Sequence, residues 1–122
     1  MDDKLKQGLI NLNTDYNKAL ERFVGNEDLY HKFLFQFLND YNFYGLKESL
    51  RYKDITSAFQ YAHTLRGVTG NLGLTPLYET TQPLVELLRN RQLAGTEVLM
   101  ETLERDYQAL CNLLRTFITD LS

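Results

Sequence analysis

The stretch "DITSAFQYAHTLRGVTGNLGL", residues 54–74, is the segment from which the fold can be deduced most directly. On a helix that turns by about 100° per residue, its apolar side chains fall into one stripe. That stripe consists of Ile55, Ala58, Phe59, Ala62, Leu65, Thr69 and Leu72. Asp54 is a suitable N-cap, since its carboxylate can accept from backbone N–H groups, and Gly73 is a suitable C-terminal cap. We therefore expect an amphipathic helix with one buried face.

Gly67 and Gly70 stand out in this helix, because an interior glycine costs about 1 kcal/mol relative to alanine. His63 lies roughly 120° from the centre of the apolar stripe, so the pattern predicts an exposed imidazole. Gly67 follows one turn later on the same side, and Gly70 flanks the same line. Small residues at this spacing often mark a tight helix–helix crossing. They can also make room for a partner macromolecule to reach His63, which is the explanation we favour, although the residues alone leave both open.

Polar side chains complete this surface. Arg66 lies between the His63 line and the edge of the core, while Gln60, Thr64 and Asn71 occupy the outer face. A guanidinium suits phosphate oxygens well, because its planar fork can donate parallel hydrogen bonds. Arg66 would therefore place a positive charge near any group that the imidazole carries.

Helix signals also dominate the rest of the chain, and no segment of useful length alternates with the period of two typical of strands. Further helices are expected over residues 13–25, 26–41, 43–53, 75–91 and 96–122. The expected N-caps are Asn13 or Thr14, Asn26, Thr75 (followed by Pro76) and Thr96. Residues 26–41 are expected to turn Leu29, Tyr30, Phe33, Phe37 and Leu38 inward, with Leu34 and Tyr41 at the margins.

The last four long segments are joined by short turns, which favours antiparallel packing of neighbours. We therefore expect one domain, residues 1–122, with an all-α fold. The expected architecture is an antiparallel four-helix bundle with additional short N-terminal helices. Pro83 lies inside the 75–91 segment and is expected to kink it.

Composition narrows the classes of function. The net charge of −3, without a Lys/Arg cluster, argues against nucleic-acid binding. No apolar run is long enough for membrane insertion. Cys111 is the single cysteine and is expected to be buried, which fits a cytoplasmic location. No nucleotide-binding motif is present, and His31, expected to be structural or solvated, lacks the spacing to form a metal site with His63.

The segment "AHTLRGVTGNLGL", residues 62–74, resembles the motif of histidine-containing phosphotransfer (HPt) domains, A-H-x-L-K-G-x-x-x-N-L-G. The matching positions are Ala62, His63, Leu65, Gly67, Asn71, Leu72 and Gly73. Upstream, "ALERFVGNEDLYHKFLFQF" is similar to the family's entry region, in which a short helix leads through a glycine turn into an acidic, tyrosine-containing helix. The resemblance extends from Ala19 to Leu88.

The resemblance implies a phosphorelay intermediate. His63 would accept a phosphoryl group on Nε2 from a receiver domain of a hybrid histidine kinase and pass it to an aspartate of a response regulator, with Mg²⁺ supplied on the receiver. The residues expected near the phosphoryl group or at the docking surface are Gln60, Thr64, Arg66, Gly67 and Gly70, with Asn71 and Gly73 as structural members of the motif. The chain would be a monomeric carrier without its own cofactor, not an enzyme.

The sequence departs from the family pattern at two positions. Arg66 stands where the family usually has lysine, and Pro83 falls in the helix expected to pack beside the histidine helix. Two alternatives stay open. One is a non-catalytic helical adaptor that docks receiver domains, with His63 incidental. The other is the phosphoacceptor domain of a chemotaxis-type histidine kinase, which the "NLG" run makes a weaker match.

Overall fold

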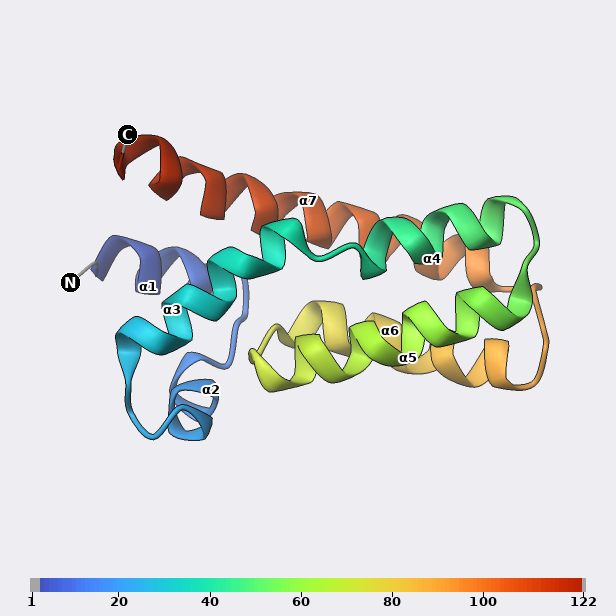
Figure 1. Cartoon of the computed structure of the whole chain (residues 1–122), viewed down its shortest axis with the longest axis horizontal. Helices are drawn as coiled ribbons and strands as arrows, with labels where there is room; N and C mark the ends of the chain where they lie inside the picture. Colours follow the sequence, from blue (N-terminus) through green and yellow to red (C-terminus); the bar gives the residue numbers. More distant parts are fainter. Residues whose placement is uncertain (1–2, 122) are drawn as a thin grey trace.

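Helices account for most of the chain, and no strand occurs within residues 3–121, the part that the computed structural model describes (Figure 1). The elements are α1 (Asp3–Asn11), α2 (Tyr16–Arg22), α3 (Glu27–Gln36), a short 3₁₀ helix η1 (Phe37–Asn39), α4 (Asn42–Arg51), α5 (Ile55–Asn71), α6 (Thr75–Arg89) and α7 (Thr96–Leu121). The all-α class expected from the sequence is therefore confirmed. Residues 1, 2 and 122 of the expected single domain lie outside the described part.

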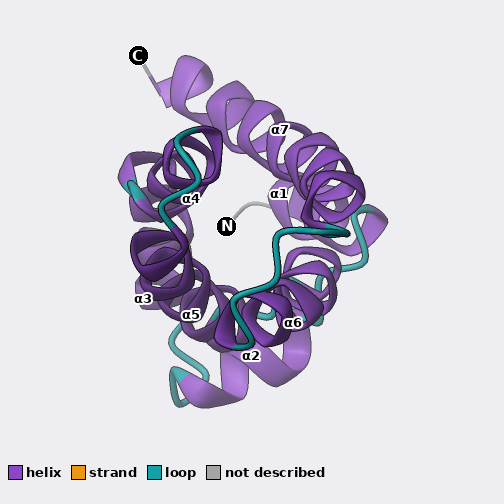
Figure 2. Ribbon diagram, turned by 90° about the vertical axis from the view of Figure 1, so that its right-hand side faces the viewer, coloured by secondary structure: helices purple, strands orange, loops and turns teal. Residues whose placement is uncertain are grey.

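Four of these helices, α4 to α7, form a bundle around a common core (Figure 2). α5 packs between α4 and α6, and α6 packs against α7. The ring closes between α7 and α4, where Phe43 stacks on Tyr107 with ring centroids 4.1 Å apart and Lys47 pairs with Glu104 at 2.7 Å. Short connections reverse the chain between successive helices (Figure 1), which confirms the antiparallel four-helix bundle.

The N-terminal helices lie at one end of this bundle, where the histidine helix α5 terminates (Figure 1). α1 packs beside α7, while α2 contacts α3. The Tyr30 hydroxyl of α3 donates to the Leu72 carbonyl at 2.7 Å and so ties α3 to the end of α5. The additional short N-terminal helices that the sequence predicts are thus present as α2 and α3, whereas the sequence predicts no helix over the residues of α1.

The predicted inward stripe of α5 is largely confirmed. Ile55 and Phe59 are partly buried, and the remaining members are buried, namely Ala58, Ala62, Leu65, Thr69 and Leu72. Cys111 is also buried, as expected. Burying one large apolar side chain contributes about 1.5–3 kcal/mol, so this stripe holds α5 in the bundle despite its glycines.

The predicted inward face of residues 26–41 is confirmed in part, since Tyr30 and Phe37 are buried and Leu38 is partly buried. Leu29 and Phe33 are 39% and 42% exposed, whereas Leu34 and His31 are buried. His31 can be buried because the Tyr16 hydroxyl lies 2.6 Å from its Nε2 and satisfies a polar ring atom. The prediction is therefore wrong for Leu29 and Phe33, which apolar character alone places inward. The α-helix also ends at Gln36, earlier than expected.

Two predicted N-caps are confirmed. Oδ1 of Asn26 accepts from the Leu29 N–H at 3.0 Å, and Oδ1 of Asp54 accepts from the Ser57 N–H at 3.1 Å. The bonds from Ser57 hold the pKa of Asp54 below its ordinary value, since they favour the ionised carboxylate.

Other predicted boundaries are wrong. Asp15, not Asn13 or Thr14, occupies the N-cap position of α2, and Leu74, not Thr75, occupies that of α6. The Asp15 N–H donates to the Gly73 carbonyl at 2.8 Å, a contact between segments far apart in the sequence. The Thr75 hydroxyl donates to the same carbonyl at 3.3 Å and does not cap α6. α6 continues past Pro83 to Arg89, so the proline marks no helix boundary.

Candidate functional site

His63 lies on the exposed side of α5, as the helical pattern predicts. Its imidazole contacts the Phe59 ring of the preceding turn, with ring centroids 5.8 Å apart and planes inclined by 39°. Gln60 and Thr64 are exposed on the same helix. An aromatic ring that supports one side of an imidazole limits its rotation while leaving the rest of the ring accessible to a partner.

The two interior glycines have different structural roles. A Cβ built at Gly67 would meet nothing within 4 Å, so no crossing helix requires a glycine there. A Cβ at Gly70 would lie 3.1 Å from the Tyr78 ring of α6, so close packing accounts for this residue. Of the two explanations that the sequence offers, an open approach therefore applies to Gly67 and a tight crossing to Gly70.

Arg66 is fixed in place by the neighbouring helix. Its guanidinium donates from Nη1 to Oε1 of Gln82 on α6 at 3.0 Å. The side chain is partly buried, and one turn of α5 separates it from His63. A positive charge held in this way needs little reordering to meet an anionic group nearby.

The C-terminal end of α5 is held by hydrogen bonds and close contacts from the N-terminal helices. Nη1 of Arg22 on α2 donates to the carbonyls of Gly70 and Asn71 at 2.8 and 3.2 Å. Gly73 has φ +72°, and a Cβ on it would lie 2.7 Å from the Asp15 carbonyl oxygen. Gly73 thus terminates α5 as predicted, in the left-handed conformation directly after the C-cap residue Leu72, and it lies against the start of α2. The Asn71 side chain is exposed.

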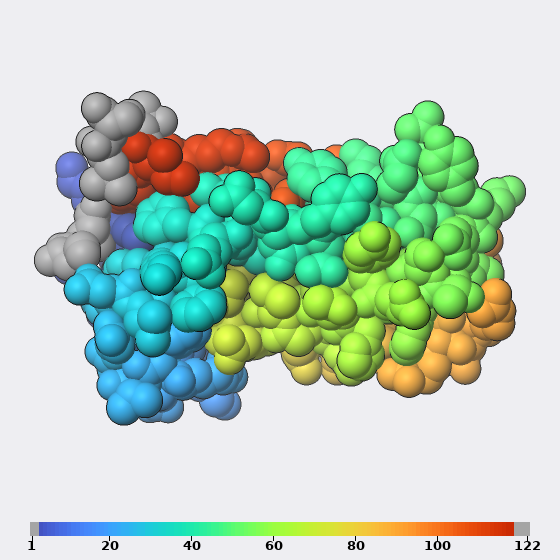
Figure 3. All heavy atoms as spheres, in the orientation of Figure 1, coloured from blue at the N-terminus to red at the C-terminus, as the bar shows by residue number. Residues whose placement is uncertain are grey.

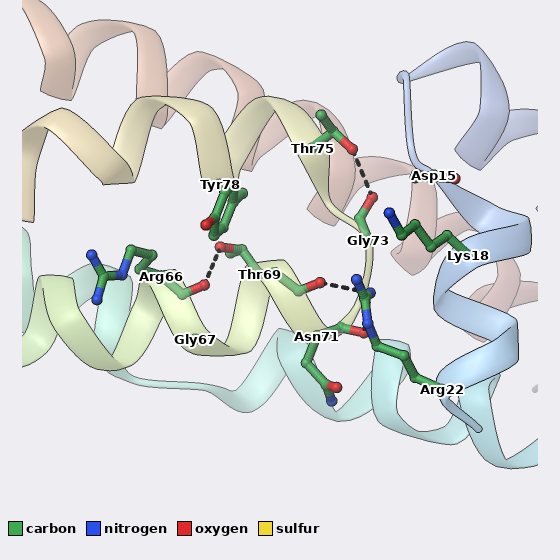
Figure 4. A pocket seen from close by; sticks show the side chains of 11 residues that line it. Asp15, Lys18, Arg22, Arg66, Gly67, Thr69, Asn71, Gly73, Thr75 and Tyr78 are labelled. Carbon is green, nitrogen blue, oxygen red and sulfur yellow. Dashed lines mark hydrogen bonds between the residues drawn. The ribbon is translucent and has the colours of Figure 1, made fainter. Parts of the chain in front are cut away.

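A surface hollow of about 560 Å³ lies where α2, α5 and α6 meet (Figure 4). It is lined by Asp15, Lys18, Arg22, Arg66, Gly67, Thr69, Gly70, Asn71, Gly73, Thr75 and Tyr78. Lys18 and Arg22 extend from α2 toward the end of α5, and Arg66 lies at the opposite end of the hollow (Figure 4). The space-filling view shows α2 projecting beside the end of α5 (Figure 3). His63 does not line this hollow, but Gly67 does.

Several residues that contact the site come from other helices, so the motif on α5 could not predict them. Arg89 of α6 places its guanidinium 5.2 Å from the centroid of Phe59, the ring that supports His63. Gln82, Lys18 and Arg22 also come from other helices. The only local signal was Phe59 itself, which stands one turn before His63 on α5.

Three other features that could carry function are a metal site, a membrane-spanning helix and a reactive thiol. Among residues 3–118, whose side chains the structure describes, no cluster of His, Cys, Asp and Glu could hold a metal ion. None of the described helices is both long and apolar enough to cross a membrane. Burial raises the pKa of the Cys111 thiol, which disfavours the reactive thiolate.

Comparison with known proteins agrees with the motif on α5. Neither the curated proteins nor the solved structures gave a significant match. The family model of the Hpt domain matches residues 43–113, a segment that contains α4, α5, α6 and most of α7. Because this match covers more than half of the chain, the chain belongs to the Hpt domain family, whose members carry phosphoryl groups on a histidine in two-component phosphorelays.

Proposed function

We propose that this chain is a phosphorelay intermediate in which His63 is the phosphoacceptor. The donor is the aspartyl phosphate of a receiver domain in a hybrid histidine kinase, and the acceptor is the aspartate of a response regulator. The observation that supports this most strongly is the exposed imidazole of His63 one turn from Gly67, where the surface of α5 carries no side chain.

The proposed reaction needs few groups from this chain. The Nε2 lone pair of His63 attacks the phosphorus of the aspartyl phosphate, the P–O bond to the aspartate breaks, and the carboxylate leaves as the N–P bond forms. The onward step is the reverse reaction with a second aspartate. Phosphoryl transfer depends mainly on positioning and charge stabilisation, and Mg²⁺ bound by the receiver supplies part of that charge.

Arg66, one turn from His63 on α5, is the residue to which we assign stabilisation of the carried group. Its guanidinium is planar and can donate two parallel hydrogen bonds to phosphoryl oxygens. The Gln82 contact leaves its other N–H groups available for such bonds. Gln60 and Thr64 are exposed beside His63 and would contact the docked receiver. Asn71 and Gly73 serve the end of α5, away from the reacting atoms.

The test is transfer of labelled phosphoryl groups from a panel of phosphorylated receiver domains to the wild type and to His63→Gln. We expect acid-labile, alkali-stable label on the wild type alone. Because His63 is exposed, the variant should melt at the same temperature as the wild type, which makes it a matched control. Receiver binding without any label would instead favour the adaptor function.

We also propose that the chain acts in the cytoplasm as a single domain, residues 1–122, and as a monomer without a metal or nucleotide site of its own. Light scattering after size-exclusion chromatography tests the oligomeric state, with a mass of 14.3 kDa expected for the monomer. Added ATP and Mg²⁺ should leave His63 unphosphorylated when no receiver or kinase is present.

A further inference from the structure

The hollow between α2, α5 and α6 carries a charge opposite to that of the molecule. Its lining includes three cationic side chains, Lys18, Arg22 and Arg66, against one acid, Asp15. The whole chain has a net charge of −3. A local excess of positive charge on an acidic protein attracts acidic groups to that place.

The three cationic residues differ in the hydrogen bonds and ion pairs that they form within the molecule. Arg22 donates to the carbonyls of Gly70 and Asn71, and Arg66 donates to Gln82. Lys18 takes part in none of the ion pairs between the described residues. Its ammonium group points toward the end of α5 (Figure 4). Lys18 therefore retains its capacity to pair with a carboxylate from outside.

The hollow adjoins the surface by which a partner would approach His63. Gly67 lines it, and a Cβ at Gly67 would meet nothing within 4 Å. A receiver that places its aspartate on His63 must cover Gly67, and a protein surface of ordinary size extends well beyond one residue. The partner is therefore brought against the hollow by the same docking event.

We infer that this hollow binds an acidic segment of the docked receiver, with Lys18 as a specificity-determining residue. The inference rests on the proposed function for the identity of the partner. α2, which supplies Lys18 and Arg22, lies outside the family-matched residues 43–113. Charge placed there can select among receivers without altering the helix that bears His63, because complementary charge governs association rate and partner choice.

The experiment compares Lys18→Glu with Lys53→Glu, a control that makes the same change of charge. Lys53 lies beyond the end of α4 and lines a different hollow, formed with residues of α7. Lys18 lies in the first turn of α2, where a glutamate is favoured by the helix dipole, so the variant should fold. For each protein, binding of the receiver that labels His63 most strongly is measured by titration, and KM and kcat of transfer are measured separately.

We expect Lys18→Glu to weaken binding and raise KM by about tenfold at low salt, since an exposed ion pair is worth up to roughly fivefold and reversal also adds repulsion. We expect kcat to be unchanged, Lys53→Glu to differ from wild type by less than about twofold, and the Lys18 effect to shrink at high salt. Equal effects of the two variants would overturn the inference. A fall in kcat with unchanged KM would also overturn it, since Lys18 would then act on the reaction.

Failure of this inference is distinguishable from failure of the proposed function. If the wild type binds a receiver without being labelled, and Lys18→Glu still weakens that binding, the hollow is a docking site and the carrier function is wrong. If label transfer is normal in both variants, the carrier function stands and the hollow has no part in docking. Competition of inorganic phosphate for the hollow without any effect on receiver binding would show a small-anion site instead.

Discussion

Replacing Gly67 should change stability and function in opposite directions. Because a Cβ at this position meets nothing within 4 Å, Gly67→Ala gains the full helix-propensity difference of about 1 kcal/mol. For a domain of this length that corresponds to a rise in Tm of about 4 °C. Gly67→Gln should retain much of the gain in stability. Its longer side chain, however, projects from the bare surface beside His63 and should slow phosphoryl transfer by about 100-fold, the effect of a small misplacement of reacting groups.

Urea denaturation gives the stability difference, and single-turnover labelling of His63 gives the rate. Gly70→Ala is the matched control, because its Cβ would press on the Tyr78 ring at 3.1 Å and so forfeit the gain in helix propensity. Transfer by Gly67→Gln at the wild-type rate would refute the open-approach explanation of this glycine. Destabilisation by Gly67→Ala would refute the packing on which the explanation rests.

Three further substitutions test other parts of the site. Gly73→Ala should destabilise the fold by about 1–3 kcal/mol, measured by urea denaturation, because its φ of +72° and the Asp15 carbonyl at 2.7 Å leave no room for a Cβ. Arg66→Ala should slow transfer by at least about tenfold, the effect of losing one charged hydrogen bond, while a titration should still show receiver binding; Gln82→Ala should slow transfer to a smaller extent. Asp54→Ala should lower stability at pH 7, and thermal melts should show the difference vanish in acid. The folded pKa of Asp54 lies below its ordinary 3.8, so its contribution is full above that value and is lost as pH falls through the folded pKa.

The motif helix was predictable because its signals are local. The apolar stripe, the Asp54 cap and the Gly73 terminus all depend on residues within a few turns, and periodicity determines which side His63 occupies. Leu29 and Phe33 of α3, which the pattern predicts to point inward and which are exposed, show the limit of such reasoning. Whether Leu29 or Leu34 is buried depends on how α3 packs, and His31 is buried through a Tyr16 hydroxyl on another helix.

The surroundings of His63 were less predictable for the same reason. Gln82, Arg89 and Lys18 reach the region from α6 and α2, at distances along the chain that no periodic pattern encodes. The sequence also could not decide between approach and packing for the glycines. The choice between the two explanations depends on the atoms around each glycine. An open approach applies to Gly67, and close packing applies to Gly70.

Hydrogen bonds from the N-terminal helices to the end of α5 explain how a helix with two interior glycines stays intact. The glycines together weaken it by roughly 2 kcal/mol, and a helix terminus leaves its last carbonyls without intrahelical partners. Here the Arg22 guanidinium takes the carbonyls of Gly70 and Asn71, and the Tyr30 hydroxyl takes that of Leu72. The N-terminal helices thus satisfy the terminus nearest the glycines. They allow Gly67 to remain bare beside His63, and they bring Lys18 to the rim of the surface that a partner must cover.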